Sequence, residues 1–252
     1  MERYQIVADL HTHTCVSSHA FNTITEMALA AHQIGHKAIA ITNHGYGTED
    51  GAHQWHFQML TTLPDVLEGV VALKGMEANV MDVQGTIDAT PYDLKNLDWI
   101  IASIHGSCIP GPLTEEETTH LWLQVAKNPY VDMIGHSEQQ CYPYDYERVI
   151  AEFAHNNKVV ELNGNSFVIR PGGTDNMRKI IAACKRSECK IALNTDAHSI
   201  YHLKAGVGHM FYLLEEANFP PELIVNSTGA RLRRELEVHK KEIVNRIGEL
   251  LV

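Results

Sequence analysis

Short apolar runs alternate with amphipathic segments along the chain. The apolar runs are mostly continuous, which is typical of strands buried on both faces of a parallel sheet. Seven runs have this character: Ile6–Leu10, Ala38–Thr42, Val70–Met76, Trp99–Ser103, Val131–Ile134, Val159–Leu162 and Ile191–Asn194. Segments with helical spacing lie between them, so the pattern predicts repeated βα units and an α/β fold.

The helix predictions rest on apolar spacing and on capping residues. Helices are expected over Thr25–Ile34, Tyr146–His155 and Thr174–Arg186, and Thr114 followed by acidic residues is typical of a helix N-terminus. Arg231–Val252 is predicted to be one amphipathic helix that caps the fold or lies at a subunit contact. The sequence has no linker and no internal repeat, so we expect a single domain over residues 1–252.

All but one of these strands end in residue types that commonly serve as metal ligands. The strand ends read Asp9-Leu10-His11-Thr12-His13, Asn43-His44, Met76-Glu77, Ile104-His105, Gly135-His136 and Thr195-Asp196-Ala197-His198. The carboxyl ends of the strands in a parallel barrel share one rim, where active sites are built. A lone histidine there is an ordinary polar residue, but the whole set on one rim predicts a multinuclear metal site.

The spacing within these strand ends fits metal binding. Side chains alternate faces along a strand, so His11 and His13 project to the same side and can bind one ion. Asp9 has the same parity and is predicted to accept the second N–H of a ligating imidazole, with an ordinary buried ion pair as the alternative. Glu77 and Asp196 each offer two oxygens, which can bridge ions roughly 3.5–4 Å apart, as phosphoryl transfer requires.

Composition narrows the class of protein. The formal net charge of -11 argues against nucleic acid as a partner, although about three divalent ions would restore about six positive charges at one place. None of the five cysteines forms a C-x-x-C pair, so we expect free thiols in a reducing, cytoplasmic compartment. Cys15 lies between predicted ligands but is not assigned as one. Since the sequence has no run of roughly 18 apolar residues, no membrane span is expected.

The motif set resembles the PHP (polymerase and histidinol phosphatase) superfamily, over nearly the whole chain. The residues that carry the resemblance are His11-Thr12-His13, His19, His44, Glu77, His105, His136 and Asp196-Ala197-His198. Further stretches are similar to its YcdX-like phosphatase branch, namely Asp9-Leu10-His11, Ala40-Ile41-Thr42-Asn43-His44-Gly45, His56-Phe57, Glu77-Ala78-Asn79 and Phe219-Pro220-Pro221-Glu222. Asn43 and Ser137 depart from the residues usual in the family, and neither is a ligand.

The resemblance implies a distorted (β/α)7 TIM-like barrel with a trinuclear metal site. One ion would take His11, His13, Glu77 and Asp196, a second His19, His44 and His198, and a third Glu77, His105 and His136. Two to three divalent ions are therefore expected, with Zn²⁺ as the family's usual occupant and Mn²⁺ or Fe²⁺ as alternatives.

The predicted function is metal-dependent hydrolysis of a small phosphate monoester by a metal-bound hydroxide. His56 is a candidate to protonate the leaving group, while Trp55, His56 and Arg170 are candidates for substrate contacts. The alternatives are a phosphodiesterase or 3'-5' exonuclease of the same superfamily, an amidohydrolase-like metal hydrolase, and a non-catalytic metal-binding protein. Whether the chains form a homo-oligomer stays open.

Overall fold

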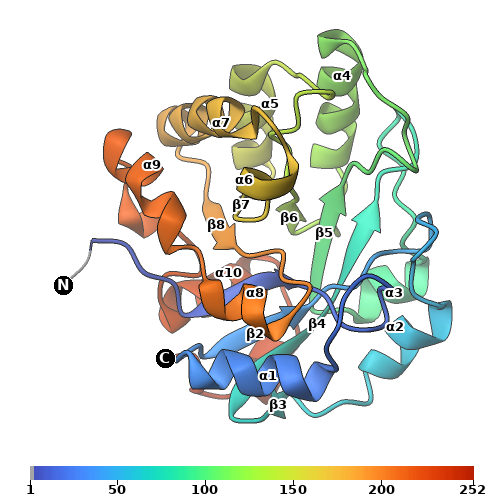
Figure 1. The fold of residues 1–252 in the computed structure, drawn as a ribbon, viewed down its shortest axis with the longest axis vertical. Helices are drawn as coiled ribbons and strands as arrows, with labels where there is room; N and C mark the ends of the chain where they lie inside the picture. The colour runs from blue at the N-terminus through green and yellow to red at the C-terminus, as the bar shows by residue number, and fades with distance from the viewer. Residues whose placement is uncertain (1–2) are drawn as a thin grey trace.

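Seven parallel strands form the centre of the fold in the computed structural model, which describes residues 3–252 (Figure 1). They are β1 (Ala8–Thr12), β2 (Ala38–Ile41), β4 (Val70–Asn79), β5 (Trp99–Ser103), β6 (Met133–Ile134), β7 (Val159–Asn163) and β8 (Ile191–Asn194). They pair in this order, and the two-residue strand β3 (Val66–Leu67) is antiparallel to β4. The sheet curls nearly into a barrel, which confirms the predicted (β/α)7 TIM-like fold.

The seam between β1 and β8 is held by side chains as well as by the backbone. The His13 N–H donates to Ala197 O at 2.8 Å beyond the strand ends. Lower down, the side-chain amide of Asn226 donates to Ala8 O at 2.8 Å and to Leu193 O at 2.7 Å. Asn226 thus takes the place of a strand residue between β1 and β8, which is why the sheet closes without a regular ladder there.

Helices cover the outside of the sheet (Figure 1). They are α1 (Ile24–Gln33), α2 (Gln54–Leu60), α3 (Pro91–Asn96), α4 (Glu115–Ala126), α5 (Tyr146–His155), α6 (Ser166–Ile169), α7 (Gly173–Ser187), α8 (Ile200–Ala205) and α9 (Phe211–Glu216), with 3-10 turns at Gly208–Met210 and Pro221–Leu223. Capping boxes at Thr23, Thr90 and Thr114 fix the starts of α1, α3 and α4, because each threonine and the acid three residues later satisfy free backbone N–H groups.

The C-terminal segment differs from the single helix predicted over Arg231–Val252. It forms α10 (Gly229–Val238) and α11 (Ile243–Arg246), separated by a turn in which Lys240 has a φ of 55°. The buried Asp132 explains the break, since the His239 ring lies 3.1 Å and the Lys241 Nζ 2.6 Å from its carboxylate. Leu236, Ile247 and other apolar residues of this segment pack against the inward side chains of the strands.

The structure also shifts the predicted element ends. β1 begins two residues later than predicted and extends to Thr12, because the Thr12 hydroxyl donates to Ala40 O at 2.6 Å and its N–H donates to Thr42. His11 therefore lies within the strand, where its direction is fixed by the sheet. Across residues 3–252 there is no helix with the length and apolar character needed to cross a membrane.

Candidate metal centre

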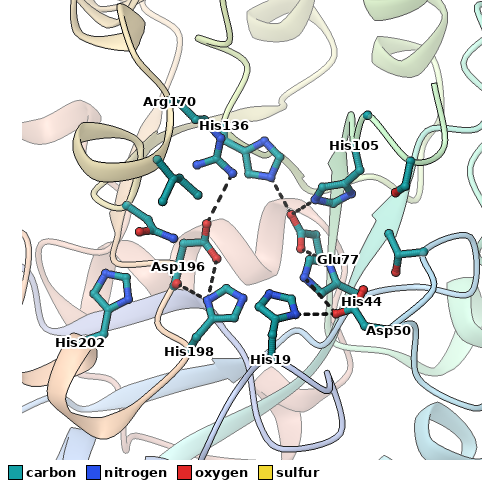
Figure 2. Close-up of a pocket in the computed structure, with 15 residues that line it drawn as sticks. His19, His44, Asp50, Glu77, His105, His136, Arg170, Asp196, His198 and His202 are labelled. Carbon is teal, nitrogen blue, oxygen red and sulfur yellow. Dashed lines mark hydrogen bonds and ion pairs between the residues drawn. The ribbon is translucent and has the colours of Figure 1, made fainter. Parts of the chain in front are cut away.

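The predicted ligands meet at the carboxyl end of the barrel. Figure 2 shows seven of them around one cavity of about 510 Å³, with side chains that point toward one another. These seven are His19, His44, Glu77, His105, His136, Asp196 and His198. His11 and His13 lie within contact distance of Glu77 and Asp196, and both are fully buried. Residues separated by up to 187 positions along the sequence thus face a single space.

Glu77 lies at the centre of this arrangement. Its Oε1 is 3.3 Å from His11 Nε2, 3.4 Å from His105 Nε2 and 2.9 Å from His136 Nε2. Its Oε2 is 3.6 Å from His13 Nε2 and 2.9 Å from His44 Nδ1. Burial raises the pKa of Glu77, but the surrounding rings, His11 first, outweigh burial and hold the pKa well below its usual value. The side chain is therefore an anion with both oxygens facing imidazoles, as a bridging ligand requires.

Asp196 occupies the opposite side of the cavity. Its Oδ1 lies 3.2 Å from His13 Nε2 and 3.7 Å from His11 Nε2. Asp196 has a φ of 56°, and His136, which also follows a strand end, has a φ of 29°. Such values are uncommon for residues other than glycine and cluster at functional sites, where the surrounding structure maintains the strain. The local backbone is thus shaped to aim two candidate ligands.

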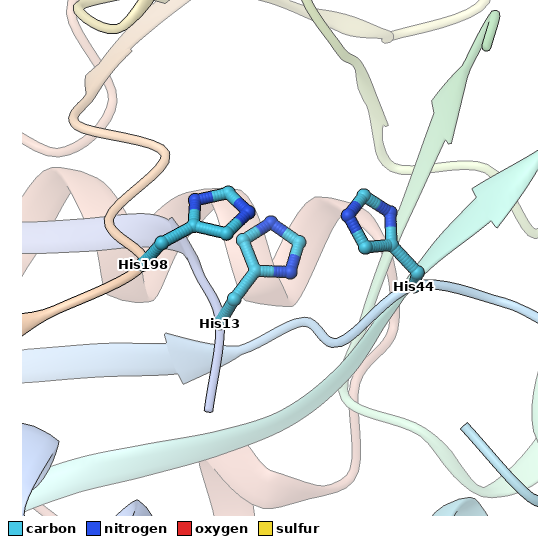
Figure 3. Close-up of side chains that lie close together, drawn as sticks. All are labelled: His13, His44 and His198. Carbon is cyan, nitrogen blue, oxygen red and sulfur yellow. The ribbon is translucent and has the colours of Figure 1, made fainter. Parts of the chain in front are cut away.

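Four groups of three side chains bring one ligand atom each to within 4.8 Å of the others. They are His11, His13 and Asp196; His13, His44 and His198; His44, Glu77 and His105; and His19, His44 and Asp50. Figure 3 shows the second group, in which the His13 ring centroid lies 4.5 Å from that of His44 and 4.3 Å from that of His198. The first group matches an ion set that the family resemblance implies, apart from Glu77, which lies beside it.

The hydrogen bonds of these side chains test whether metal ions fit. Several buried nitrogen and oxygen atoms have no hydrogen-bond partner among the described residues: His11 Nε2, His13 Nδ1 and Nε2, His44 Nδ1, Asp50 Oδ2, Glu77 Oε2 and His198 Nε2. An unsatisfied buried polar atom costs about 1–3 kcal/mol. So many of them directed at one space are explained by cations, because imidazole nitrogens and carboxylate oxygens are common ligands of zinc and related ions. The residues present therefore fit a cluster of divalent ions.

Glu161 orients the buried end of the centre, and the sequence prediction missed it. It is fully buried in β7, and its carboxylate accepts from His11 Nδ1 and from the His136 N–H, each at 2.8 Å. The side-chain amides of Asn163 and Asn194 also donate to it, each at 3.0 Å. Burial raises the pKa of Glu161, but the adjacent His11 ring outweighs burial and keeps the pKa below its usual value. Glu161 thus fixes the His11 ring with Nε2 directed at Glu77.

The role predicted for Asp9 belongs to Glu161. Asp9 accepts from the His11 backbone N–H at 3.2 Å, not from its ring, and from the Thr195 N–H and hydroxyl at 3.0 and 2.6 Å. Burial raises the pKa of Asp9 to about 7. The side chain points across the seam toward β8, because the neighbouring threonine offers two donors there. Asp9 therefore fixes the backbone that carries His11 and Asp196.

Asp50 is a second acid that the sequence prediction missed. It lies in the loop after β2, where no periodic pattern indicates which way a side chain points. Its Oδ2 lies 2.8 Å from His19 Nδ1 and 3.9 Å from His44 Nε2, without the alignment of a hydrogen bond. Metal-ligand atoms that point at one shared cation lie close together in this way without forming hydrogen bonds to one another. The position of Asp50, five residues before the predicted substrate contact Trp55, was its only sequence signal.

Comparison with known proteins shows the family of this chain. The sequence profile of the PHP domain family matches residues 9–165, more than half of the chain. The chain belongs to the PHP domain family. A probable phosphatase of Acetivibrio thermocellus is 38% identical to this PHP domain protein over 242 residues, which are 96% of this chain and 99% of that protein. A probable phosphatase of Caldanaerobacter subterraneus is also 38% identical over 242 residues, 96% of this chain and 95% of that protein.

The fold of this PHP domain is similar to that of solved structures. Histidinol phosphate phosphatase from Lactococcus lactis, solved with zinc, L-histidinol and phosphate, has a TM-score of 0.57 at 17% identity over 84% of this chain and 94% of that one. A probable 2-pyrone-4,6-dicarboxylic acid hydrolase from Acinetobacter baumannii has a TM-score of 0.50 at 12% identity over 92% and 100% of the two chains. At these identities the likeness shows the fold alone.

The predicted substrate contacts of the PHP domain separate into two groups. Arg170 lines the cavity, and its Nη2 lies 3.7 Å from Asp196 Oδ2. Trp55 is 66% exposed, and neither it nor His56 is among the residues that line the cavity. The His56 Nε2 instead lies 3.1 Å from the Asn43 side-chain amide, and burial lowers the pKa of His56 to about 4. His56 therefore lies outside the cavity lining, whereas Arg170 is placed to contact a ligand.

Proposed function

We propose that this PHP domain protein hydrolyses small phosphate monoesters with two to three divalent ions held at the carboxyl end of the barrel. The observation that carries the proposal is the set of buried, unpartnered imidazole and carboxylate atoms on residues that line the cavity or lie against its lining. When bound, such ions supply a water of lowered pKa as the nucleophile and positive charge for the phosphate oxygens. The curated relatives named as probable phosphatases support this activity.

The side chains of the centre determine its net charge. Glu77, Asp196 and Asp50 contribute three negative charges, whereas three divalent ions would bring about six positive charges. The excess positive charge suits a phosphate monoester, which is itself an anion. Since imidazoles supply most of the ligand atoms, we propose Zn²⁺ as the main occupant, with Mn²⁺ or Fe²⁺ able to replace it.

Arg170 is proposed to orient the phosphate group. Its guanidinium is held by the Ser166 hydroxyl at 2.9 Å and by Asn163 Oδ1 at 3.4 Å, and Ser166 in turn donates to the buried Glu138. The long side chain is thereby fixed before a ligand arrives, which reduces the entropy lost on binding. A guanidinium fork matches two phosphate oxygens, and a monoester has three free oxygens, so a monoester can contact Arg170 and the metal ions at the same time.

Metal removal tests the proposed function directly. Protein dialysed against a chelator is expected to lose hydrolysis of para-nitrophenyl phosphate, and added Zn²⁺ or Mn²⁺ is expected to restore it. Elemental analysis of the purified protein should find two to three ions per chain. The bis-ester, bis(para-nitrophenyl) phosphate, is expected to react more slowly because it has only two free phosphate oxygens to share between Arg170 and the metal ions.

The same measurements separate the competing functions. A higher kcat/KM for the bis-ester would favour the phosphodiesterase or exonuclease alternative. Inertness toward both esters with full metal occupancy would favour an amidohydrolase-like enzyme or a metal-binding protein. Either result would contradict a monoesterase.

Asp50 is proposed as a further ligand in the subsite of His19 and His44. Asp50→Ala is expected to weaken binding of the most loosely held ion by roughly 10–100-fold, because one anionic ligand is lost beside the exposed His19. Zinc titration against a chromophoric chelator measures this change without reference to turnover. Glu49→Ala is the matched control, and equal zinc affinities for the two variants would exclude Asp50 as a ligand.

A further inference from the structure

The most exposed large apolar side chains lie in segments that flank the metal centre. Within residues 3–252, the three highest exposures in this class belong to Phe21 at 79%, Val168 at 80% and Tyr201 at 80%. They lie in the segments that follow β1, β7 and β8 respectively. β7 pairs with β8, and β8 lies beside β1 across the seam, so the three segments are neighbours on one arc of the rim.

Backbone hydrogen bonds tie this arc to the candidate ligands. The Phe21 N–H donates to His198 O at 2.9 Å, and the Ile200 N–H donates to the Asn22 side chain at 2.9 Å. The loop after β1 and the start of α8 are thus joined, and Figure 1 shows α8 beside α1. Phe21 and Tyr201 are therefore held on a fixed frame next to His198.

The cavity reaches this arc. Ile169, which is 55% exposed, lines the cavity next to Arg170, and His202 lines it next to Tyr201. The facing part of the lining, from the loops after β2 and β5, is polar and includes Thr48, Asp50 and Ser107. A volume of about 510 Å³ lies in the range of roughly 300–1,000 Å³ that is usual for organic ligands. A phosphate group at the metals would leave space open toward the apolar arc.

We propose that Phe21, Val168, Ile169 and Tyr201 form an apolar rim that binds the leaving group of the substrate. The physiological substrate is then a phosphate monoester with an aromatic or extended aliphatic group close to the ester bond. Exposed apolar surface on a fixed frame beside a catalytic cavity costs free energy of hydration, and a substrate that covers it recovers that cost. This inference rests on the proposed function.

Two substrates with the same ester chemistry test the rim. The leaving groups of 2-phenylethyl phosphate and ethyl phosphate are both primary alkoxides, but only the first carries a ring that could contact the rim. For the wild-type protein, kcat/KM is expected to be about tenfold higher for 2-phenylethyl phosphate. In the double variant Phe21→Ala/Tyr201→Ala this preference should disappear, while ethyl phosphate is hydrolysed as before. Both side chains are exposed, so their truncation should leave the fold intact.

Tyr130→Ala is the matched control, because Tyr130 is an exposed tyrosine that precedes β6 at the opposite end of the barrel. It should retain the preference for the phenyl compound. Equal preference in the wild type and the double variant would overturn the rim proposal, and ethyl phosphate hydrolysis would show separately whether the phosphatase proposal holds. A wild-type dimer that dissociates in the double variant in sedimentation, with no change in preference, would assign the rim to a subunit interface and overturn it too.

Discussion

Glu77→Gln is expected to lower kcat/KM for a phosphate monoester by roughly 10³-fold or more. The amide keeps the shape of the side chain, but only one of its oxygens remains and the negative charge is lost. Glu77 faces five imidazoles with its two oxygens, which is why we propose it as the bridging ligand. Steady-state kinetics together with elemental analysis should show fewer ions bound per chain.

A loss of activity by unfolding must be distinguished from a loss of metal. The circular dichroism spectrum of Glu77→Gln is expected to match that of the wild type, because the barrel core does not depend on this side chain. His11→Ala is also expected to lose activity with an unchanged spectrum, since the His11 ring contacts both Glu77 and Asp196. Monoesterase activity that persists in a metal-free Glu77→Gln/His11→Ala protein would disprove catalysis by a metal cluster at this site.

Glu161→Ala is expected to destabilise the protein by about 3–5 kcal/mol as well as to weaken metal binding. Removal of this carboxylate leaves the His136 N–H and the amides of Asn163 and Asn194 without their buried acceptor. It also frees the His11 ring, and loss of such an outer contact typically costs 10–100-fold in metal affinity or activity. Urea unfolding and zinc titration measure the two effects.

Two further variants separate positioning from stability. Glu161→Gln keeps one acceptor oxygen and should recover part of the stability, but it should still bind zinc more weakly than the wild type because His11 loses its anionic partner. Glu235→Gln changes another buried glutamate, paired with Lys190 at the opposite end of the barrel, and should lower stability while zinc affinity is unchanged. Wild-type zinc affinity in Glu161→Gln would show that Glu161 does not orient the centre.

The sequence predicted the candidate metal ligands at the strand ends but not Glu161, which supports them from inside the barrel. Residues at strand ends, such as His44, His105 and His136, follow long apolar runs, and topology brings such positions together whatever the details of packing. Glu161 lies inside a strand, and only its alternation with Val159 and Asn163 on one face marked it as inward. Whether an inward carboxylate binds a cation, a histidine or a lysine depends on which side chains of the neighbouring strands lie beside it. The pattern of a single sequence does not give these contacts.

The hydrophobic pattern of the sequence also did not predict the side-chain directions after β2 or the break in the C-terminal helix. Asp50 lies in the loop after β2 and the exposed Trp55 lies in the first turn of α2, yet only Asp50 lines the cavity. The turn between α10 and α11 contains no glycine or proline that would predict a break, although Lys240 has a positive φ. It arises because His239 and Lys241 pair with Asp132, and such distant partners override local helix propensity. The side chain of His239 is for this reason only 6% exposed.

The seam and the C-terminal segment together dictate when this protein can finish folding. One edge of β1 stays open until β8 and Asn226 have been synthesised, and Leu10 belongs to an apolar cluster that includes the C-terminal residues Leu232 and Leu251. Pairings this remote in sequence form late, since the intervening chain must first be ordered. Until the C-terminal segment has been synthesised, the inward apolar side chains of the strands lack part of their native covering, so the growing chain is expected to need protection from aggregation during translation.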